Sequence, residues 1–161
     1  MNGVVVSDTS PVCYLIMTDV AGHLPRLFKE VLVPPAVIDE LASPRSPAIV
    51  QQWIASPPAW FQIVAPRNAP DILGLDRGET QAIWLCEEYG IKSILIDERK
   101  GTRVARDRGF RVAGTLAVVE RLAERGWVSF DEVITRLRMT TFRYNEQIID
   151  DIRIRLRSKQ Q

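Results

Sequence analysis

The sequence contains very little histidine and cysteine. Its 161 residues include one histidine, His23, and two cysteines, Cys13 and Cys86. Most zinc enzymes need several His or Cys ligands, and a Ser-His-Asp mechanism would have to use His23, for which no partner is signalled. The two cysteines lack CxxC spacing and indicate reduced thiols in a cytoplasmic protein. Any acid, base or metal chemistry must therefore be carried by carboxylates.

Long hydrophobic runs are also missing. No apolar run approaches the ~20 residues of a membrane-spanning helix, and the apolar run Val4 to Val6 is far too short for a secretory signal. We therefore expect a cytoplasmic protein without a membrane partner. With 46% hydrophobic and 25% charged residues, the chain has the composition of an ordinary globular protein. We expect a single domain over residues 1–161, with a helical tail from about residue 130.

No proline follows Pro70, so short elements are expected before it and longer helices after it. The pattern predicts apolar strands that alternate with helices, which favours an α/β fold with a mainly parallel sheet covered on both faces. Strands are expected at 3–7, 31–33, 61–65, 93–96 and 110–113. Helices are expected at 11–18, 24–29, 36–41, around 53, and at 77–89, 101–108 and 116–125, followed by C-terminal helices.

Two aspartates directly follow apolar strands. Asp8 directly follows "VVVS", and Asp97 directly follows "SILI". Either residue is explained as a turn or capping acid, but Ser10 is expected to cap the first helix, with Pro11 at its first position. Because parallel strands carry their sites beyond their carboxyl ends, we expect the two carboxylates at the same edge of the sheet.

Two glutamates have structural and functional explanations of similar weight. In "VPPAVIDEL", the helical period places Asp39 toward solvent and Glu40 beside the buried face, where it is either a boundary residue or a site residue. In "LDRGETQAIWL", Asp76 and Glu79 fit a capping box. Glu79 also shares a helix face with the apolar stripe, which directs it over the end of the sheet.

Four converging acids would repel one another, and a hard divalent cation with oxygen ligands, Mg²⁺ or Mn²⁺, relieves that repulsion. Such a site supports hydrolysis of phosphodiester bonds.

The net charge is only +1, but basic residues gather in Arg99–Arg111 and in Ile152–Gln161. These runs are either solvated helix faces or contacts for nucleic-acid phosphates.

Five segments in order resemble PIN-domain proteins, in particular a predicted nucleic-acid-binding branch related to the VapC-type toxin ribonucleases. They are "VVVSDTSPV", "VLVPPAVIDEL", "LDRGETQAIWL", "LIDERKGTRVARDRGFRVAGTLAVVERL" and, more weakly, "FRYNEQIIDDI". The resemblance implies a three-layer α/β/α sandwich, an acidic Mg²⁺ or Mn²⁺ site and cleavage of RNA. It makes Asp8, Glu40, Glu79 and Asp97 the catalytic and metal-binding acids. Ser10 matches a supporting hydroxyl, and Glu98 stands where a second Asp is common.

The sequence thus predicts a metal-dependent endoribonuclease, in which Arg99, Lys100, Arg103 and Arg106 are candidates for contact with RNA. The alternative is a PIN-type module that binds nucleic acid or protein without catalysis. At the C-terminus, Ile148, Ile152 and Leu156 form a helical stripe, although "IRIRLR" also alternates as a strand would. The stripe predicts core packing or, alternatively, contact with a second copy or a small antitoxin protein.

Overall fold

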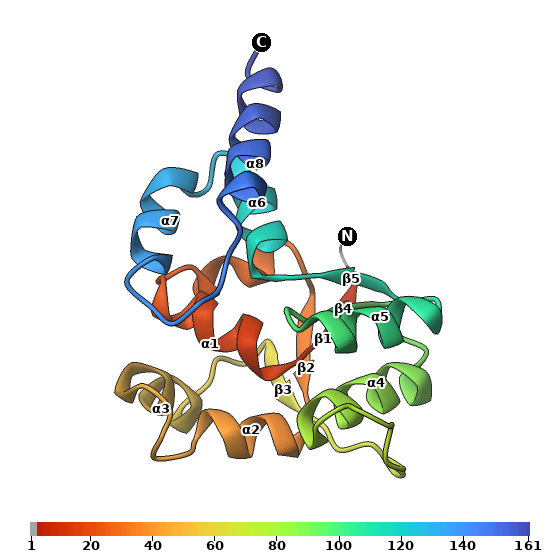
Figure 1. The fold of residues 1–161 in the computed structure, drawn as a ribbon. Helices are drawn as coiled ribbons and strands as arrows, with labels where there is room; N and C mark the ends of the chain where they lie inside the picture. Colours follow the sequence, from red (N-terminus) through yellow and green to blue (C-terminus); the bar gives the residue numbers. More distant parts are fainter. Residues whose placement is uncertain (1–2) are drawn as a thin grey trace.

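A five-stranded parallel sheet forms the centre of the molecule (Figure 1). The computed structural model describes residues 3–161. The strand order is β3-β2-β1-β4-β5, and every neighbouring pair is parallel. The strands are β1 (Val4–Ser7), β2 (Glu30–Val33), β3 (Phe61–Ile63), β4 (Ser93–Leu95) and β5 (Arg111–Ala113). The expected α/β fold is confirmed, and the strand around Phe61 lies at an edge.

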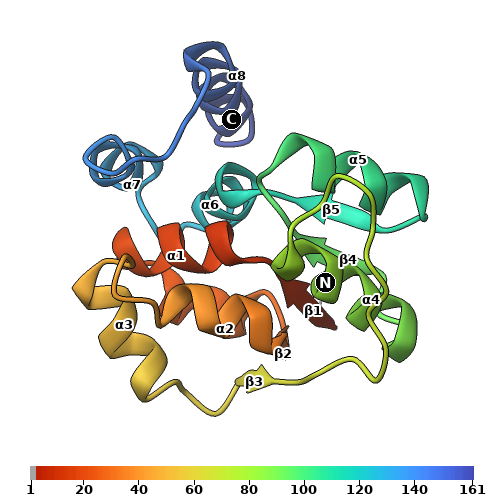
Figure 2. The ribbon, with the colours of Figure 1, turned by 60° about the horizontal axis from the view of Figure 1, so that its bottom comes forward.

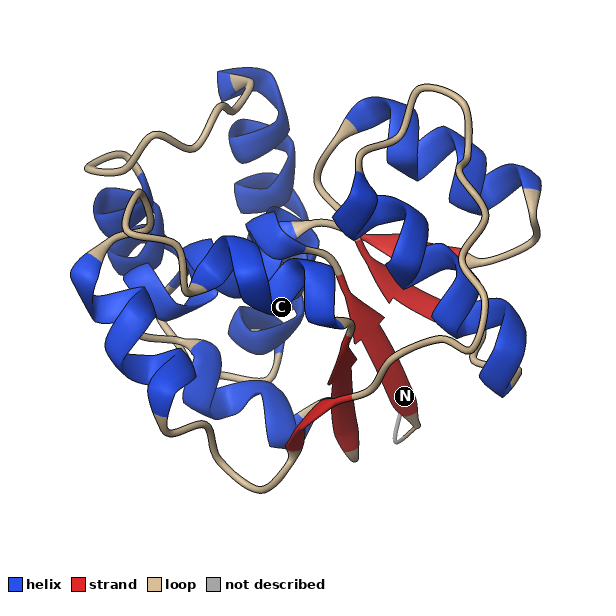
Figure 3. Cartoon of the chain, turned by 90° about the horizontal axis from the view of Figure 1, so that it is seen from below, coloured by secondary structure: helices blue, strands red, loops and turns tan. Residues whose placement is uncertain are grey.

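Helices cover both faces of the sheet and form a three-layer arrangement (Figures 2 and 3). One face packs against α4 (Arg77–Tyr89) and α5 (Arg99–Asp107). The hydrophobic core on the other face is shared by α1 (Thr9–Met17), α2 (Pro35–Leu41), α3 (Ala48–Ala55), the 3-10 helix η1 (Ala21–Arg26), α6 (Thr115–Glu124), α7 (Phe130–Leu137) and α8 (Glu146–Ser158). Of these helices, α7 packs on α1 and α6, and α8 packs on α6. In Figure 1, α6 and α8 lie side by side above the sheet.

Side chains alternate between two hydrophobic cores because successive residues of a strand point to opposite faces. Val5 and Leu95 join the larger core, whereas Val6 and Ile94 join the core under α4 and α5. All four are at most 1% exposed. Strands buried on both faces explain the continuous apolar runs, since no strand face is left for polar residues.

The start of α1 differs from the prediction. The helix begins at Thr9 with Asp8 at the N-cap, so Ser10 and Pro11 are the second and third helical residues. Proline is tolerated there because N–H groups of the first helical turn have no intrahelical partner. The expected capping role of Ser10 was therefore wrong. The Asp8 side chain makes no capping hydrogen bond and remains available for the strand end.

The C-terminal segment Ile152–Arg157 is helical and belongs to α8. Ile152 is buried together with Ile149, while Ile148 is 47% exposed, so the predicted stripe packs only in part. The expected helix at 24–29 is replaced by η1, which contains Pro25. No helix within residues 3–161 is long and apolar enough to cross a membrane.

Candidate carboxylate site

The candidate site lies where the strand order reverses. β1 is paired with β2 on one side and β4 on the other, and the crevice beyond such a switch point is the usual site in α/β sheets. The backbone N–H of Asp8 donates to the Leu95 carbonyl at 2.9 Å, which joins the ends of β1 and β4. Asp97 follows two residues later. The two aspartates therefore occupy adjacent strand ends, as the sequence predicts.

Gly78 lies between Asp8 and Glu40. A Cβ atom at Gly78 would be 3.1 Å from Glu40 Oε1, 3.3 Å from Val37 Cγ2 and 3.4 Å from Asp8 Oδ1. The two carboxylates thus approach the same point beside the first turn of α4. A side chain at this position would occupy the space between the two carboxylates, so the glycine before Glu79 leaves that space open.

Glu79 has both of the roles considered for it. Its backbone N–H donates to Asp76 Oδ1 at 2.8 Å, and its Oε2 accepts from the Asp76 N–H at 3.2 Å, which completes the capping box. Glu79 is nevertheless only 6% exposed. The capping box therefore holds a buried carboxylate at the end of the sheet.

Burial and mutual repulsion raise the pKa values of these acids. Burial is the main cause that raises the pKa of Asp8 to about 8, and the Thr9 backbone amide opposes it. The charges of three neighbouring acids, Asp76, Glu79 and Glu40, add to that rise. Burial, with the Asp76 charge next in size, raises the pKa of Glu79 to about 7. Burial also raises the pKa of Glu40. These three acids and Asp76 form the carboxylate cluster.

Asp97 is held to one side of this cluster by Thr115. Its Oδ1 accepts from the Thr115 backbone N–H at 2.6 Å, and its Oδ2 accepts from the Thr115 hydroxyl at 2.7 Å. Burial raises the pKa of Asp97, and both of these hydrogen bonds oppose the rise. Asp97 thus lies at the same sheet edge but satisfies the N-terminus of α6.

The donor chemistry of the cluster fits a hard divalent cation. Carboxylate oxygens are the ligands that Mg²⁺ and Mn²⁺ prefer. No Lys or Arg nitrogen within residues 3–161 lies within 4.0 Å of the carboxylates of Asp8, Glu40 or Glu79. The buried Thr9 Oγ1 has no geometrically satisfactory hydrogen-bond partner, although it is close enough to lower the pKa of Glu40. Over the described part of the chain, no three Asp, Glu, His or Cys side chains are arranged as a metal site.

The supporting residues expected from the sequence lie at helix starts. Ser10 is half-buried in the first turn of α1. Glu98 is the N-cap of α5, and its carboxylate accepts from the Gly101 N–H at 2.9 Å. The Glu98 charge also contributes to the raised pKa of Glu79. Glu98 therefore borders the cluster from the side of α5.

The four basic candidates on α5 are exposed and divide into two groups. Arg99, Arg103 and Arg106 line a hollow of about 460 Å³ that also includes Asp97. Lys100 instead packs over the loop before α4, where its Nζ would be only 2.0 Å from a Cβ on Gly74. Three of the four predicted cations thus border the sheet edge that carries the acids.

Two residues gain a part in the site that the sequence did not assign. Asp76 was expected only as a cap, yet its charge acts on Asp8, Glu40 and Glu79. Its place at the start of α4, beside Glu79, was the available signal. Thr115 lies 18 residues from Asp97, so no local pattern could have indicated their contact.

Comparison with known families agrees with this architecture. A family model described as a PIN domain matches residues 4–158. No match to a curated protein and none to a solved structure was found. The family match spans all five strands and all four predicted acids, and it agrees with the parallel α/β sheet described above. The chain belongs to the PIN-domain family.

Proposed function

We propose that this protein is a metal-dependent endoribonuclease whose acidic site lies beyond β1 and β4. The PIN family has a nuclease-type fold, which supports a hydrolase at the coarse level. One observation carries the proposal: Asp8, Glu40 and Glu79 converge, Asp8 and Glu79 are buried, and no Lys or Arg of residues 3–161 forms an ion pair with any of the three. Such an arrangement raises the cost of ionising each acid, and a divalent cation compensates for it.

Asp8, Glu40 and Glu79 would hold Mg²⁺ or Mn²⁺, with Asp97 at the border of the site. A bound divalent ion supplies an activated water and stabilises charge on the leaving oxygen. The protein itself positions these acids. The capping box orients Glu79, and the backbone hydrogen bond from Asp8 to Leu95 fixes Asp8 at the strand end. Arg99, Arg103 and Arg106, which line the hollow beside Asp97, would bind phosphates that flank the scissile bond.

The test of this proposal is Asp8→Asn. It keeps the shape of the side chain but removes the charge, and we expect Mn²⁺-dependent cleavage of a mixed RNA pool to fall about a hundredfold or more, since a few kcal/mol of transition-state stabilisation corresponds to that factor. Asp39→Asn is the matched control, because Asp39 is exposed beside Glu40 on α2. Equal cleavage by Asp8→Asn and the native protein would contradict the proposal.

Calorimetric titration with Mn²⁺ distinguishes the nuclease from a module that binds without catalysis. A nuclease requires that the native protein binds Mn²⁺ and cleaves RNA, and that Asp8→Asn weakens both. Binding of RNA without turnover would favour the module. The kinship with VapC-type toxins and the antitoxin partner stay predictions, for which co-purification with the product of a neighbouring small gene is the measurement.

A further inference from the structure

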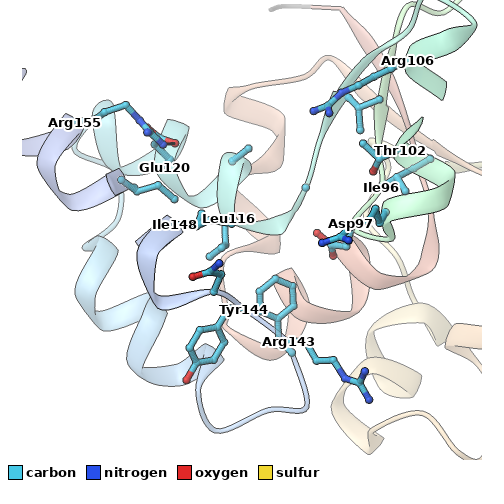
Figure 4. A pocket seen from close by; sticks show the side chains of 17 residues that line it. Ile96, Asp97, Thr102, Arg106, Leu116, Glu120, Arg143, Tyr144, Ile148 and Arg155 are labelled. Atoms are coloured by element: carbon cyan, nitrogen blue, oxygen red, sulfur yellow. Dashed lines mark hydrogen bonds and ion pairs between the residues drawn. The ribbon is translucent and has the colours of Figure 1, made fainter. Parts of the chain in front are cut away.

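A cleft of about 560 Å³ opens beside Asp97, and Asp8 is not among the residues that line it (Figure 4). Its walls come from α5, from the first half of α6, from α8 and from the α7–α8 connection, which comprises residues 138–145. Its volume lies within the range of about 300–1,000 Å³ that is typical of small-molecule sites. The cleft continues the candidate site because Asp97 belongs to both.

The cleft carries free positive charge. Among the residues that line it, Arg99, Arg106 and Arg143 have no ion-pair partner within 4.0 Å anywhere in residues 3–161. Of its two acids, Glu120 is paired with Arg155 through two contacts of 2.7 and 3.0 Å. The other acid, Asp97, accepts from Thr115. An anionic ligand therefore meets uncompensated arginines in this cleft.

Apart from Thr102 and Asn145, the remaining lining is apolar and aromatic. Leu116 and Ile148 lie on one side of the cleft in Figure 4, and Tyr144 lies at its rim. A site for phosphates alone would not need such a surface. A nucleobase does, because its flat faces stack on aromatic and apolar side chains while its backbone contacts arginines.

The α7–α8 connection is anchored to α1, the helix that begins after Asp8. The Tyr14 hydroxyl lies 3.0 Å from the Thr141 hydroxyl, and the rings of Tyr14 and Phe142 pack edge to face with centroids 4.9 Å apart. This anchoring positions Arg143 and Tyr144 relative to the strand end. The cleft is thus built by contacts between distant parts of the chain.

We propose that this cleft is a subsite for an unstacked base of single-stranded RNA, in which Tyr144 stacks on the base and Arg143 and Arg106 bind the adjoining phosphates. The subsite rests on the proposed nuclease function, since it places a nucleotide next to the candidate acids. Its consequence is a preference for single strands, because the bases of a duplex are already stacked and paired.

Binding without cleavage tests the subsite directly. Fluorescence anisotropy in EDTA measures the affinity of the full chain for a short labelled single-stranded RNA and for the same RNA in a duplex. Ala117→Phe fills the cleft from an exposed position on α6, and Tyr144→Leu removes the stacking surface. We expect each to weaken single-strand binding on the order of tenfold, the scale of one lost base stack, and to leave duplex binding unchanged.

The salt dependence separates phosphate contacts from stacking. Arg143→Ala should reduce the slope of log affinity against log salt by about 0.7, the value for one phosphate contact on a single strand. Tyr144→Leu should leave the slope unchanged. Arg157→Ala and Tyr89→Leu are matched controls from exposed positions outside the cleft, and both should bind as the native protein does.

The subsite is overturned if native protein binds no single-stranded RNA, or if Tyr144→Leu binds single strands as tightly as the native protein. Thermal unfolding shows whether Ala117→Phe is folded. If Ala117→Phe does not fold, the binding of Tyr144→Leu alone tests the subsite. The subsite stands and the nuclease fails if the variants lose binding but native protein with Mn²⁺ cleaves nothing. The nuclease stands and the subsite fails if cleavage depends on Asp8 while both cleft variants bind and cleave RNA as the native protein does.

Discussion

Acidic side chains gather in two parts of the molecule, at the ends of β1 and β4 and on α6 and α7, where α8 packs. In the second region, three of the four acids pair with a cation within residues 3–161. Glu120 contacts Arg155, Glu124 contacts Lys159, and Asp131 contacts Arg153 at 2.7 Å. At the strand ends, the acids instead face one another. Ion pairs are thus frequent where α8 is attached to the domain, whereas within residues 3–161 the carboxylates of Asp8, Glu40 and Glu79 have none.

The same comparison applies to the basic residues. The tail of α8 and the α5 run are equally prominent in the sequence, but Arg153, Arg155 and Lys159 are occupied by acids of the chain itself. Arg99 and Arg106 of α5 have no such partners among residues 3–161. Most cations of the α8 tail are therefore compensated within the chain, although Arg157 has no ion-pair partner among residues 3–161, whereas Arg99 and Arg106 at the proposed site are both uncompensated.

The largest effect of this difference is on the pH dependence of stability. Folding raises the pKa of Asp8 to about 8 and that of Glu79 to about 7, so the folded protein holds protons that the unfolded chain releases near pH 4. This contribution to stability is fully present below about pH 4 and is lost as the pH rises toward 7 to 8, at up to about 1.4 kcal/mol per pH unit for each group.

Urea unfolding at pH 5 and pH 8 measures this loss. Asp8→Asn cannot ionise, and we expect it to remove the Asp8 part of the slope and to make the variant more stable than the native protein at pH 8. Mn²⁺ should restore native stability at pH 8 and do little at pH 5, since it binds the deprotonated acids. Identical slopes for the native protein and Asp8→Asn would show that Asp8 ionises normally.

Thr115→Val tests Asp97, the acid at the strand ends whose two carboxylate oxygens both accept hydrogen bonds from Thr115. The change keeps the backbone N–H bond to Asp97 but removes the hydroxyl that donates to its Oδ2. We expect the free energy of unfolding at pH 7 to fall by about 1.5–3 kcal/mol, the range for a hydrogen bond to a charged group.

Thr115→Ser is the matched control, because it keeps the hydroxyl and should retain most of the stability. Denaturant titration of the three proteins gives the comparison. A loss as large in the serine variant would assign the effect to the buried methyl group of Thr115 and not to Asp97.

Gly78→Ala separates the two acids that meet beside α4. The new methyl group would lie 3.1 Å from Glu40 Oε1 and 3.4 Å from Asp8 Oδ1, so the carboxylates must shift. Alanine also favours the helix by roughly 0.5–1 kcal/mol, which offsets the steric cost. We expect nearly native stability but about tenfold weaker Mn²⁺ affinity, the lower end of the effect of altered ligand support.

Calorimetry with Mn²⁺ measures this change. Gly22→Ala in η1 is the control, because a Cβ atom there meets no heavy atom within 4 Å. Unchanged Mn²⁺ affinity in Gly78→Ala would mean that the metal is not held between Asp8 and Glu40.

Sequence patterns predicted the elements of this site well because each pattern is local. A valine run before Asp8, a capping box at Asp76 and Glu79, and the glycine after α4 each specify structure within a few residues, and Gly90 does adopt the left-handed conformation with φ of 65°. Parallel strands then bring Asp8 and Asp97 to one edge by geometry alone.

What the sequence did not predict depends on contacts between distant segments. Two examples are the hydrogen bond from Thr115 to Asp97 and the contact of residues 138–145 with Tyr14. Both join parts of the chain that no periodicity relates. The pairing of α8 with α6 is of the same kind. A run of arginines has the same appearance in sequence whether its partners are acids of the chain or phosphates of a ligand.

The smallest effect is expected where α8 forms ion pairs with the rest of the domain. Asp131→Asn removes one partner of Arg153, which retains Asp150 at 3.4 Å. Both aspartates are more than half exposed, and exposed ion pairs contribute only about 0.2–1 kcal/mol. Urea unfolding should therefore show a loss below about 1 kcal/mol that shrinks in high salt, while Mn²⁺ affinity and RNA cleavage stay native. A fall in RNA cleavage would instead make α7 and α8 part of the functional surface, because Asp131 lies outside both the carboxylate cluster and the cleft.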